Sequence, residues 1–192
     1  MIAGVILAAG SSLRLGRPKQ LLMWRGRPLL QHVVEAAASS NLSELVVVLG
    51  HEAGRISDAL TLPEGARLVH NPDYRSGQAS SLRVGLTALS DDSHAAAILL
   101  SDNPFVTAGL IDRVIEEFEL SSASVVRPRI AEVPGHPVVV ARQEWERWKG
   151  ITGDEGARYL LAGADVLEVP IEGADYADVD TWDDYNSLLE RD

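Results

Sequence analysis

A segment near the beginning of the sequence has the composition of a phosphate-binding loop. It places six small or apolar residues ahead of two cations, in the order Leu7, Ala8, Ala9, Gly10, Ser11, Ser12, Arg14 and Lys19. Small side chains let the backbone curl and turn its N–H groups toward an anion, and the two cations would add positive charge to the same polyphosphate. The spacing excludes two familiar phosphate loops. A P-loop ends in Gly-Lys-Ser/Thr, and a dinucleotide fingerprint has glycine where Ser12 stands.

The distribution of charge also indicates a local anion site. The 192 residues include 17 Lys and Arg and 28 Asp and Glu, for a net charge of −11. An acidic protein is poorly suited to bind nucleic acid or an anionic membrane. However, five basic residues and no acidic residue precede Glu35, so the opening segment carries +5 and the remainder −16. Phosphate is the anion that we expect there; a solvated basic turn is the other interpretation.

Two aspartates stand out because of their position relative to the predicted elements. Asp102 lies just after the predicted buried strand Ala96–Leu100, and open α/β sheets bind ligands at the carboxyl ends of their strands. The alternative for Asp102 is a turn residue before Pro104. Asp180 stands beside Thr181, the expected cap of the last helix, and its alternative is to stabilise the start of that helix.

Short apolar runs alternate with longer amphipathic stretches along the whole chain. Continuous apolar strands bounded by helices are typical of a parallel sheet covered on both faces. We therefore predict an α/β fold, with residues 1–192 forming a single three-layer α/β/α domain around a mostly parallel sheet. The predicted strands are Ile2–Ala8, Leu45–Leu49, Ala66–His70, Ala96–Leu100, Ala123–Pro128, Pro137–Ala141, which is a candidate antiparallel strand, and Asp165–Val169. The predicted helices are Pro28–Ser39, Ala53–Leu60, Ser80–Leu89, Gly109–Leu120, Asp154–Leu161 and Thr181–Leu189.

The composition excludes several other classes of protein. The sequence has no cysteine, which excludes a disulfide framework, a thiolate zinc site and a cysteine nucleophile. Its apolar runs are far shorter than the roughly 18 residues of a membrane-spanning helix. No basic residue precedes the first apolar stretch, as one would in a signal peptide. We expect a cytoplasmic protein that binds neither nucleic acid nor a membrane.

The first loop resembles the signature of nucleotidyltransferases with a MobA-like fold, Leu-Ala-Ala-Gly-x-Ser-x-Arg-x-Gly-x-x-Lys. Later segments are similar to the molybdenum cofactor cytidylyltransferase branch of that family. These segments are Asn71-Pro72 with Gly77 and Ser81, Gly135-His136-Pro137, Gly153-Asp154 with Arg158, and Asp178-Val179-Asp180-Thr181. The resemblance covers almost the whole chain and implies a Rossmann-like, glycosyltransferase-A-like nucleotidyltransferase fold. The chain departs from the family pattern at Leu15, at Ser101 and Asn103 beside Asp102, and at Trp182.

The resemblance implies roles for the matching residues. The nucleotide would be held by Leu7, Ala8, Ala9, Gly10, Ser11, Ser12, Lys19, Asn71, Gly77 and Ser81. Arg14, Lys19 and Asp102 would be catalytic, and Asp102 and Asp180 would bind Mg²⁺, a cation that takes one or two carboxylates plus substrate oxygens. His136 and Arg158 would bind the acceptor. Their structural alternatives are a core hydrogen bond for His136 and a helical i, i+4 partner of Asp154 for Arg158.

The implied reaction is a Mg²⁺-dependent transfer of CMP from CTP to the phosphate of a molybdopterin-type molybdenum cofactor, with release of pyrophosphate. The Ala8-Ala9 pair resembles the CTP users of this fold more than the GTP users. Three alternatives stay open: a guanylyltransferase that uses GTP, a nucleotidyltransferase for another phosphorylated acceptor, and a non-catalytic escort protein. Such an escort would bind nucleotide or pterin and deliver cofactor to a molybdoenzyme, the partner that this assignment implies.

Overall fold

The described residues, 1–149 and 163–191 of the computed structural model, build one eight-stranded sheet. The strands follow the order β10-β7-β9-β6-β1-β4-β5, and β8 pairs with β7. The bounds are β1 Ile2–Ala8, β4 Leu45–Leu49, β5 Ala66–His70, β6 Ala95–Leu100, β7 Val125–Ile130, β8 Val133–Pro134, β9 Val138–Ala141 and β10 Val166–Ile171. A separate hairpin pairs β2, Met23–Trp24, with β3, Arg27–Pro28.

The sheet is mostly parallel, as predicted. β1 runs parallel to β4 and β6, β4 to β5, and β10 to β7. β9 is antiparallel to both of its neighbours, β6 and β7, which confirms the antiparallel strand expected at Pro137–Ala141. The chain moves from β1 to β4 and β5 on one side and then returns to β6 on the other side. This reversal creates a switch point at the carboxyl end of β1, where α/β sheets bind ligands.

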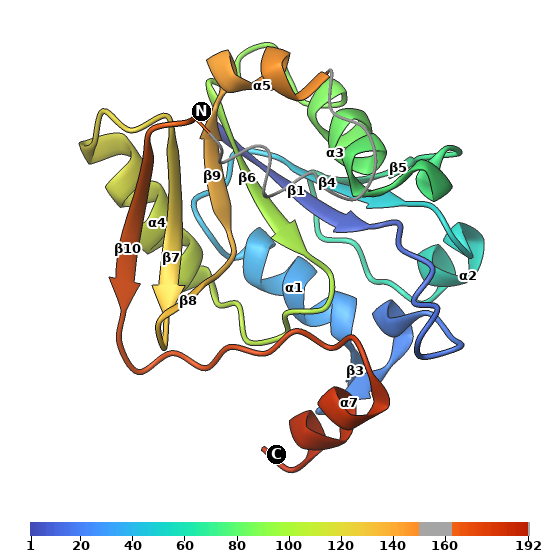
Figure 1. Ribbon diagram of the computed structural model, residues 1–192. Helices are drawn as coiled ribbons and strands as arrows, with labels where there is room; N and C mark the ends of the chain where they lie inside the picture. The colour runs from blue at the N-terminus through green and yellow to red at the C-terminus, as the bar shows by residue number, and fades with distance from the viewer. Residues whose placement is uncertain (150–162, 192) are drawn as a thin grey trace.

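Helices cover both faces of the sheet and complete the three layers (Figure 1). α1 (Leu29–Ala38) and α4 (Ala108–Leu120) share one apolar cluster with Ile6 of β1. α3 (Gln78–Thr87) and α5 (Arg142–Lys149) share the opposite cluster with Val5. Neighbouring residues of β1 thus enter different layers, because successive side chains of a strand point to opposite faces. The short α2 (Ala53–Asp58) follows β4.

The predicted strands near the carboxyl end of the chain were placed too early. β7 was expected to end at Pro128 and extends to Ile130, and β10 was expected to end at Val169 and extends to Ile171. The polar residues of these strands are compatible with pairing, since Glu168 of β10 forms ion pairs with arginines of β7. An apolar run marks only the part of a strand that is buried on both faces.

The α-helix α5, within the described residues, was not predicted. α5 packs the buried side chain of Trp145 against the sheet, although most of its residues are charged or polar. A charged sequence of this length does not by itself indicate a buried face. The helix expected over Asp154–Leu161 lies outside the described residues.

The C-terminal helix α7 (Trp182–Leu189) is connected to the first loop through a third apolar cluster. After β10, the chain runs across the carboxyl ends of the strands toward the hairpin (Figure 1). The cluster joins Val179 and Leu188 of the C-terminal segment to four residues of the N-terminal segment, Leu15, Leu22, Trp24 and Leu29. Thr181 caps α7 as predicted, because its hydroxyl accepts the N–H of Asp184 at 3.2 Å. This packing brings Asp180 to the first loop.

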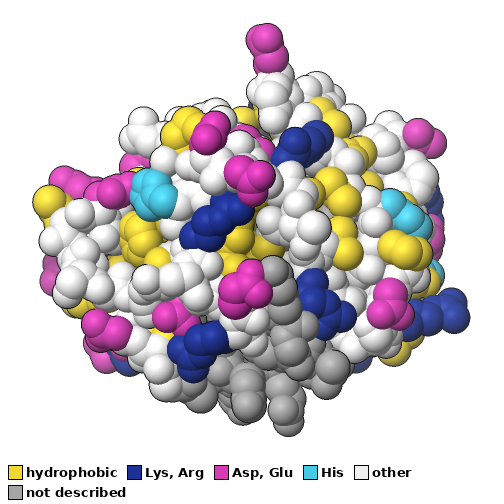
Figure 2. All heavy atoms as spheres, turned by 90° about the horizontal axis from the view of Figure 1, so that it is seen from above, with side chains coloured by type: hydrophobic (Ala, Val, Ile, Leu, Met, Phe, Trp, Pro, Cys, Tyr) yellow, Lys and Arg dark blue, Asp and Glu magenta, His cyan; other side chains and the backbone are white. Residues whose placement is uncertain are grey.

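Basic and acidic side chains are interspersed over the face of the molecule that Figure 2 shows. Within residues 1–149 and 163–191, no helix combines the length and the hydrophobicity that crossing a membrane requires.

Candidate active site

The first loop curls tightly between β1 and the 3-10 turn η1 (Lys19–Leu21). Ser12 adopts a positive φ of 50°, and its carbonyl accepts the N–H groups of Leu15 at 3.0 Å and Gly16 at 3.2 Å. The hydroxyl of Ser12 accepts the backbone N–H of Lys19 at 3.1 Å. The hydrogen bonds of Ser12 therefore stabilise the bend of the loop and connect the loop to the start of η1.

Lys19 joins two carboxylates from distant parts of the chain. Its Nζ donates to Asp180 Oδ1 at 2.7 Å and also forms a short hydrogen bond with Asp102 Oδ2. Asp180 in turn forms an ion pair with Arg14, whose Nη1 lies 3.6 Å from Asp180 Oδ2. The side chains of Lys19 and Asp102 are 16% and 9% exposed, whereas Arg14 is 71% exposed. The structure thus brings together all four of the predicted catalytic and metal-binding residues.

The charge of Lys19 is maintained by its two partners. Burial alone lowers the pKa of an ammonium group, but the charges and hydrogen bonds of Asp102 and Asp180 outweigh this effect and raise the pKa of Lys19. Lys19 is therefore a permanent cation at neutral pH. The site holds one ammonium between two carboxylates, with a guanidinium at its exposed edge.

A third carboxylate, Asp178, lies behind this cluster. Asp178 Oδ2 accepts the hydroxyl hydrogen of Tyr176 at 2.8 Å. Burial, together with the neighbouring charge of Asp102, raises the pKa of Asp178 to about 6. Burial and the Asp178 carboxylate also raise the pKa of Tyr176, so its hydroxyl stays a donor. The backbone holds the segment in place, since Val179 N donates to the carbonyl of Asp102 at 3.3 Å.

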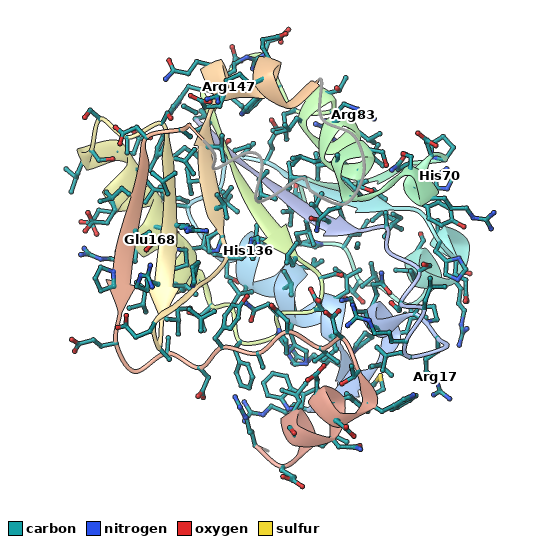
Figure 3. The ribbon with its side chains drawn as sticks, in the orientation of Figure 1. Arg17, His70, Arg83, His136, Arg147 and Glu168 are labelled. Carbon is teal, nitrogen blue, oxygen red and sulfur yellow. The ribbon has the colours of Figure 1, made fainter. Side chains whose placement is uncertain are left out.

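His136 lies at the ends of the central strands, beneath β9 in Figure 3. Its Nδ1 is 3.3 Å from the carbonyl oxygen of Ile98, so this nitrogen must carry the proton and donate. Burial lowers the pKa of His136, which makes the imidazole neutral at pH 7. The contact matches the structural alternative for His136, a core hydrogen bond. A role of His136 in binding the acceptor substrate remains a prediction.

A cavity of about 580 Å³ opens at the carboxyl ends of β1, β4 and β6. Eight predicted site residues line it: Leu7, Ala9, Gly10, Ser11, Lys19, Gly77, Ser81 and Asp102. They come from the first loop, from the start of α3 and from the end of β6. The cavity therefore occupies the switch point of the sheet, and the Lys19–Asp102 pair forms part of its wall.

Other predicted residues support the cavity from outside its wall. Asn71 is 1% exposed, and its Nδ2 donates to the hydroxyl oxygens of Ser80 at 2.8 Å and Ser81 at 3.0 Å. Its Oδ1 accepts the N–H of Asp73 at 3.0 Å. With these three bonds, Asn71 orders the start of α3. Ala8 belongs to the buried core, and Arg158 lies outside the described residues.

The cavity also has lining residues that were not predicted as site residues. They include Gln20, His51, Tyr74, Arg75 and Gln78. Apart from Gln20, which follows Lys19 directly, they come from the loops after β4 and β5, including η2 (Tyr74–Ser76), and from the start of α3. Gln20 follows Lys19, and Tyr74, Arg75 and Gln78 lie within the segment from Asn71 to Ser81, so their closeness to predicted residues was the signal that could have indicated them.

The donor set fits a divalent cation that is shared with a substrate. Among the described residues, no three acidic or histidine side chains gather into a complete metal cage. Two carboxylates, Asp102 and Asp180, meet at the same ammonium group. Mg²⁺ is typically bound by one or two carboxylates while substrate phosphates and water complete its octahedron. These two aspartates have the required chemistry.

Comparisons with known proteins show which family the chain belongs to. A model of the MobA-like NTP transferase domain matches residues 4–169. The nicotine blue oxidoreductase of Paenarthrobacter nicotinovorans is 34% identical over 199 residues, covering 98% of this chain and 96% of that protein. The molybdenum cofactor cytidylyltransferase of Escherichia coli K12 is 25% identical over 188 residues, covering 97% and 95%.

Solved structures have the same fold. The Rv0371c protein of Mycobacterium tuberculosis has a TM-score of 0.89 and 34% identity, covering 98% of this chain and 97% of that one. A structure of Rv0371c in complex with manganese has a TM-score of 0.84 and 30% identity, with 98% of each chain covered. The expected Rossmann-like nucleotidyltransferase fold is thereby confirmed. From the family match and these relatives, the chain belongs to the MobA-like NTP transferase domain family and is a nucleotidyltransferase.

Proposed function

We propose that this protein is a Mg²⁺-dependent cytidylyltransferase that transfers CMP from CTP to the phosphate of a molybdopterin-type cofactor. The main support for this proposal is the ammonium of Lys19, which lies between Asp102 and Asp180 at the wall of the 580 Å³ cavity. A nucleoside triphosphate needs such a combination: a curled backbone and a cation for its phosphates, and carboxylates for the metal ion that accompanies it.

The reaction forms one bond and breaks another at the α-phosphorus of the triphosphate. An oxygen of the acceptor phosphate attacks this phosphorus, and the bond from the α-phosphorus to the bridging oxygen breaks. Pyrophosphate leaves with that electron pair. The acceptor monoester is already anionic at neutral pH, so no side chain has to remove a proton from it.

The residues of the site would act on charge and orientation. Two polyanions repel each other, and negative charge grows on the departing pyrophosphate, so fixed cations lower the barrier. Lys19 and Arg14 would supply this charge. Asp102 and Asp180 would hold Mg²⁺, which when bound neutralises phosphate oxygens and favours in-line geometry. The structure of the relative Rv0371c in complex with manganese supports the use of a divalent ion by a protein of this fold.

The choice of nucleotide and acceptor rests on resemblance. The Ala8-Ala9 pair resembles the CTP users of the fold, and the relative from Escherichia coli is named a molybdenum cofactor cytidylyltransferase. His136 and Arg158 are the proposed acceptor-binding residues. Because a nucleoside triphosphate is the substrate, we expect the enzyme to work in the cytoplasm. Because its product is a molybdenum cofactor, we expect a molybdoenzyme to receive that product.

The test supplies each of the four nucleoside triphosphates with Mg²⁺ and purified molybdopterin-type cofactor. We expect pyrophosphate release that requires both cofactor and metal and is fastest with CTP. Thermal unfolding with and without the triphosphate gives an independent measure of binding. A triphosphate present at 100 times its dissociation constant should add about 2.7 kcal/mol to the free energy of unfolding.

Four results would overturn the proposal. Release that is fastest with GTP would identify a guanylyltransferase, and release only with a sugar phosphate would identify another acceptor. Tight binding of nucleotide or pterin without release would identify an escort protein. The relative named nicotine blue oxidoreductase motivates a further arm, in which nicotine blue and a reduced nicotinamide dinucleotide replace the cofactor and the triphosphate. Reduction of the dye by a protein that releases no pyrophosphate would also contradict the proposal.

A further inference from the structure

We propose that Gln20 is a positioning residue that orients the phosphate-binding amides of the first loop. This inference rests on the proposed function, because it assumes that the loop binds a triphosphate. Gln20 follows Lys19 in η1, lines the cavity and is only 1% exposed. Its Nε2 donates to the carbonyl oxygens of Ala8 at 2.8 Å and Gly10 at 3.1 Å. One carboxamide thus connects two peptide units of the loop.

The geometry of the peptide bond explains why these two contacts matter. In a trans peptide, the carbonyl of one residue and the N–H of the next point in opposite directions. A carbonyl of Ala8 that faces Gln20 therefore turns the N–H of Ala9 away from Gln20. The same relation connects the carbonyl of Gly10 to the N–H of Ser11. Ala9 and Ser11 both line the cavity, so Gln20 determines the direction of two amides at the site.

The turn η1 holds the loop at three successive alternate residues. Gln20 binds the carbonyls at positions 8 and 10, and the backbone N–H of Lys19 binds the hydroxyl of Ser12 at 3.1 Å. The ammonium of Lys19 belongs to the same turn and contacts Asp102. Because one rigid turn carries all of these groups, it aligns the loop amides with the cation. A small rotation of the loop would misalign them.

The other end of the carboxamide indicates that Gln20 is not there for stability alone. Its Oε1 is buried and finds no hydrogen-bond partner within the described part of the chain. A buried acceptor without a partner lowers the stability of the folded state. An apolar side chain of the same length would avoid this cost, but it would leave the carbonyl oxygens of Ala8 and Gly10 without their donor. The two donated bonds to the loop are what glutamine adds at this position.

The test replaces Gln20→Met, which keeps the length of the side chain and removes both donors. We expect the affinity for CTP with Mg²⁺ to fall about tenfold or more, whereas the affinity for CMP falls less than about threefold. The temperature of unfolding should change little, because the unpaired Oε1 is removed while the carbonyl oxygens of Ala8 and Gly10 lose their donor. The kcat/KM with CTP should fall together with the affinity. Titration calorimetry and thermal unfolding measure these quantities on the full chain.

Gln31→Met is the matched control. Gln31 is also a buried glutamine, 6% exposed, and its carboxamide bonds to Glu35 and to both backbone groups of Thr61, away from the cavity. We expect this variant to lose stability and to keep wild-type affinity for CTP. Gln20→Leu, which also has no donor for the two carbonyls, should weaken CTP binding as the methionine variant does.

Two results would overturn the role of Gln20. The first is wild-type CTP affinity in either Gln20 variant. The second is an equal loss of CTP and CMP affinity with a lowered unfolding temperature, because this pattern would describe a purely structural residue. If the wild-type protein bound no nucleoside triphosphate with Mg²⁺, the proposed function would be wrong, and that measurement precedes the comparison of variants.

Discussion

At the scale of single residues, the balance of charge around Lys19 dominates the site. Asp102 is nearly buried and Asp180 is half exposed, yet both contact the same ammonium. A buried carboxylate requires a nearby opposite charge, and the ammonium of Lys19 supplies it for Asp102. Asp180 shares this ammonium and also contacts Arg14. Because Asp180 has two cationic partners, it can exchange one of them while Asp102 stays paired with Lys19. The arrangement suits a site in which cations exchange during a reaction.

Asp102→Asn tests the metal assignment. Asparagine keeps the shape of the side chain and can still accept from Lys19, while Asp180 still compensates the ammonium. We expect the fold to be retained, with a loss of about 1–2 kcal/mol in the free energy of unfolding. Pyrophosphate release should fall at least about a hundredfold.

Asp112→Asn is the control for this variant, since Asp112 accepts the backbone N–H of Asn41 at 2.7 Å on the surface, away from the cavity. It should release pyrophosphate at the wild-type rate. Wild-type activity in Asp102→Asn would refute the metal role of that residue.

At the scale of elements, the position of α3 depends on a close approach to the sheet. A Cβ added at Gly85 would lie 2.5 Å from Val5 Cγ1 and 3.0 Å from Val48 Cγ2. Only glycine lets the helix pack at this depth against β1 and β4. Because Gly77 and Ser81 at the start of α3 line the cavity, this packing also sets the depth of the site.

Gly85→Ala should therefore destabilise the protein, although alanine favours helices more than glycine does. We expect a loss of about 1–3 kcal/mol from overpacking. In α4, a Cβ at Gly109 would meet nothing within 4 Å, so Gly109→Ala should instead stabilise by up to about 1 kcal/mol. Urea unfolding measures both. Equal effects of the two substitutions would contradict this account of α3.

The cap of α7 is a second element whose loss can be measured. Thr181 and Asp184 form a reciprocal capping box, in which Asp184 Oδ2 accepts the N–H of Thr181 at 2.8 Å. Thr181→Ala should cost about 1 kcal/mol in chemical unfolding, and Thr181→Ser, which keeps the hydroxyl, should cost clearly less. An alanine variant as stable as the wild type would show that the cap adds nothing to the fold.

At the scale of the whole molecule, the last strand closes the structure. Among the described strands, β10 lies at the edge of the sheet and pairs with β7, and the chain then crosses the site to reach α7. Glu168 of β10 accepts from Arg127 Nε at 2.9 Å and Arg129 Nε at 2.7 Å, and Figure 3 shows Glu168 on this outer strand. The hydrogen bonds of Arg129 and then Arg127 lower the pKa of Glu168.

This lowered pKa predicts a pH dependence of stability. A carboxylate with a lower pKa in the folded state stabilises the protein above its ordinary value of 4.5, and this contribution disappears as the pH falls through the folded pKa. Glu168→Gln should lose about 1 kcal/mol at pH 7. The difference from the wild type should shrink as the pH falls below about 4.5. Urea unfolding at pH 7 and pH 3 tests this, and a difference that grew with acid would contradict the ion pair.

The sequence alone was sufficient for much of the fold and part of the site. The predicted bounds of β1, β4 and β5 match the structure to the residue. For the buried strands β1 and β4, the reason is that local runs of apolar side chains encode them. The cap at Thr181 was equally local. Lys19 and Asp102 were recognised from their types and from the elements that precede them.

The tertiary structure decided which of these residues meet. Lys19 and Asp180 are 161 positions apart, and only the apolar cluster between α7 and the N-terminal hairpin brings them into contact. The same is true of Gln20, whose bonds depend on the curl of the first loop, and of Asn71, whose amide is used within the fold. Local patterns follow from the alternation of side chains along one element. Contacts across the chain depend on many weak packing interactions summed over the whole molecule, which no single stretch of sequence contains.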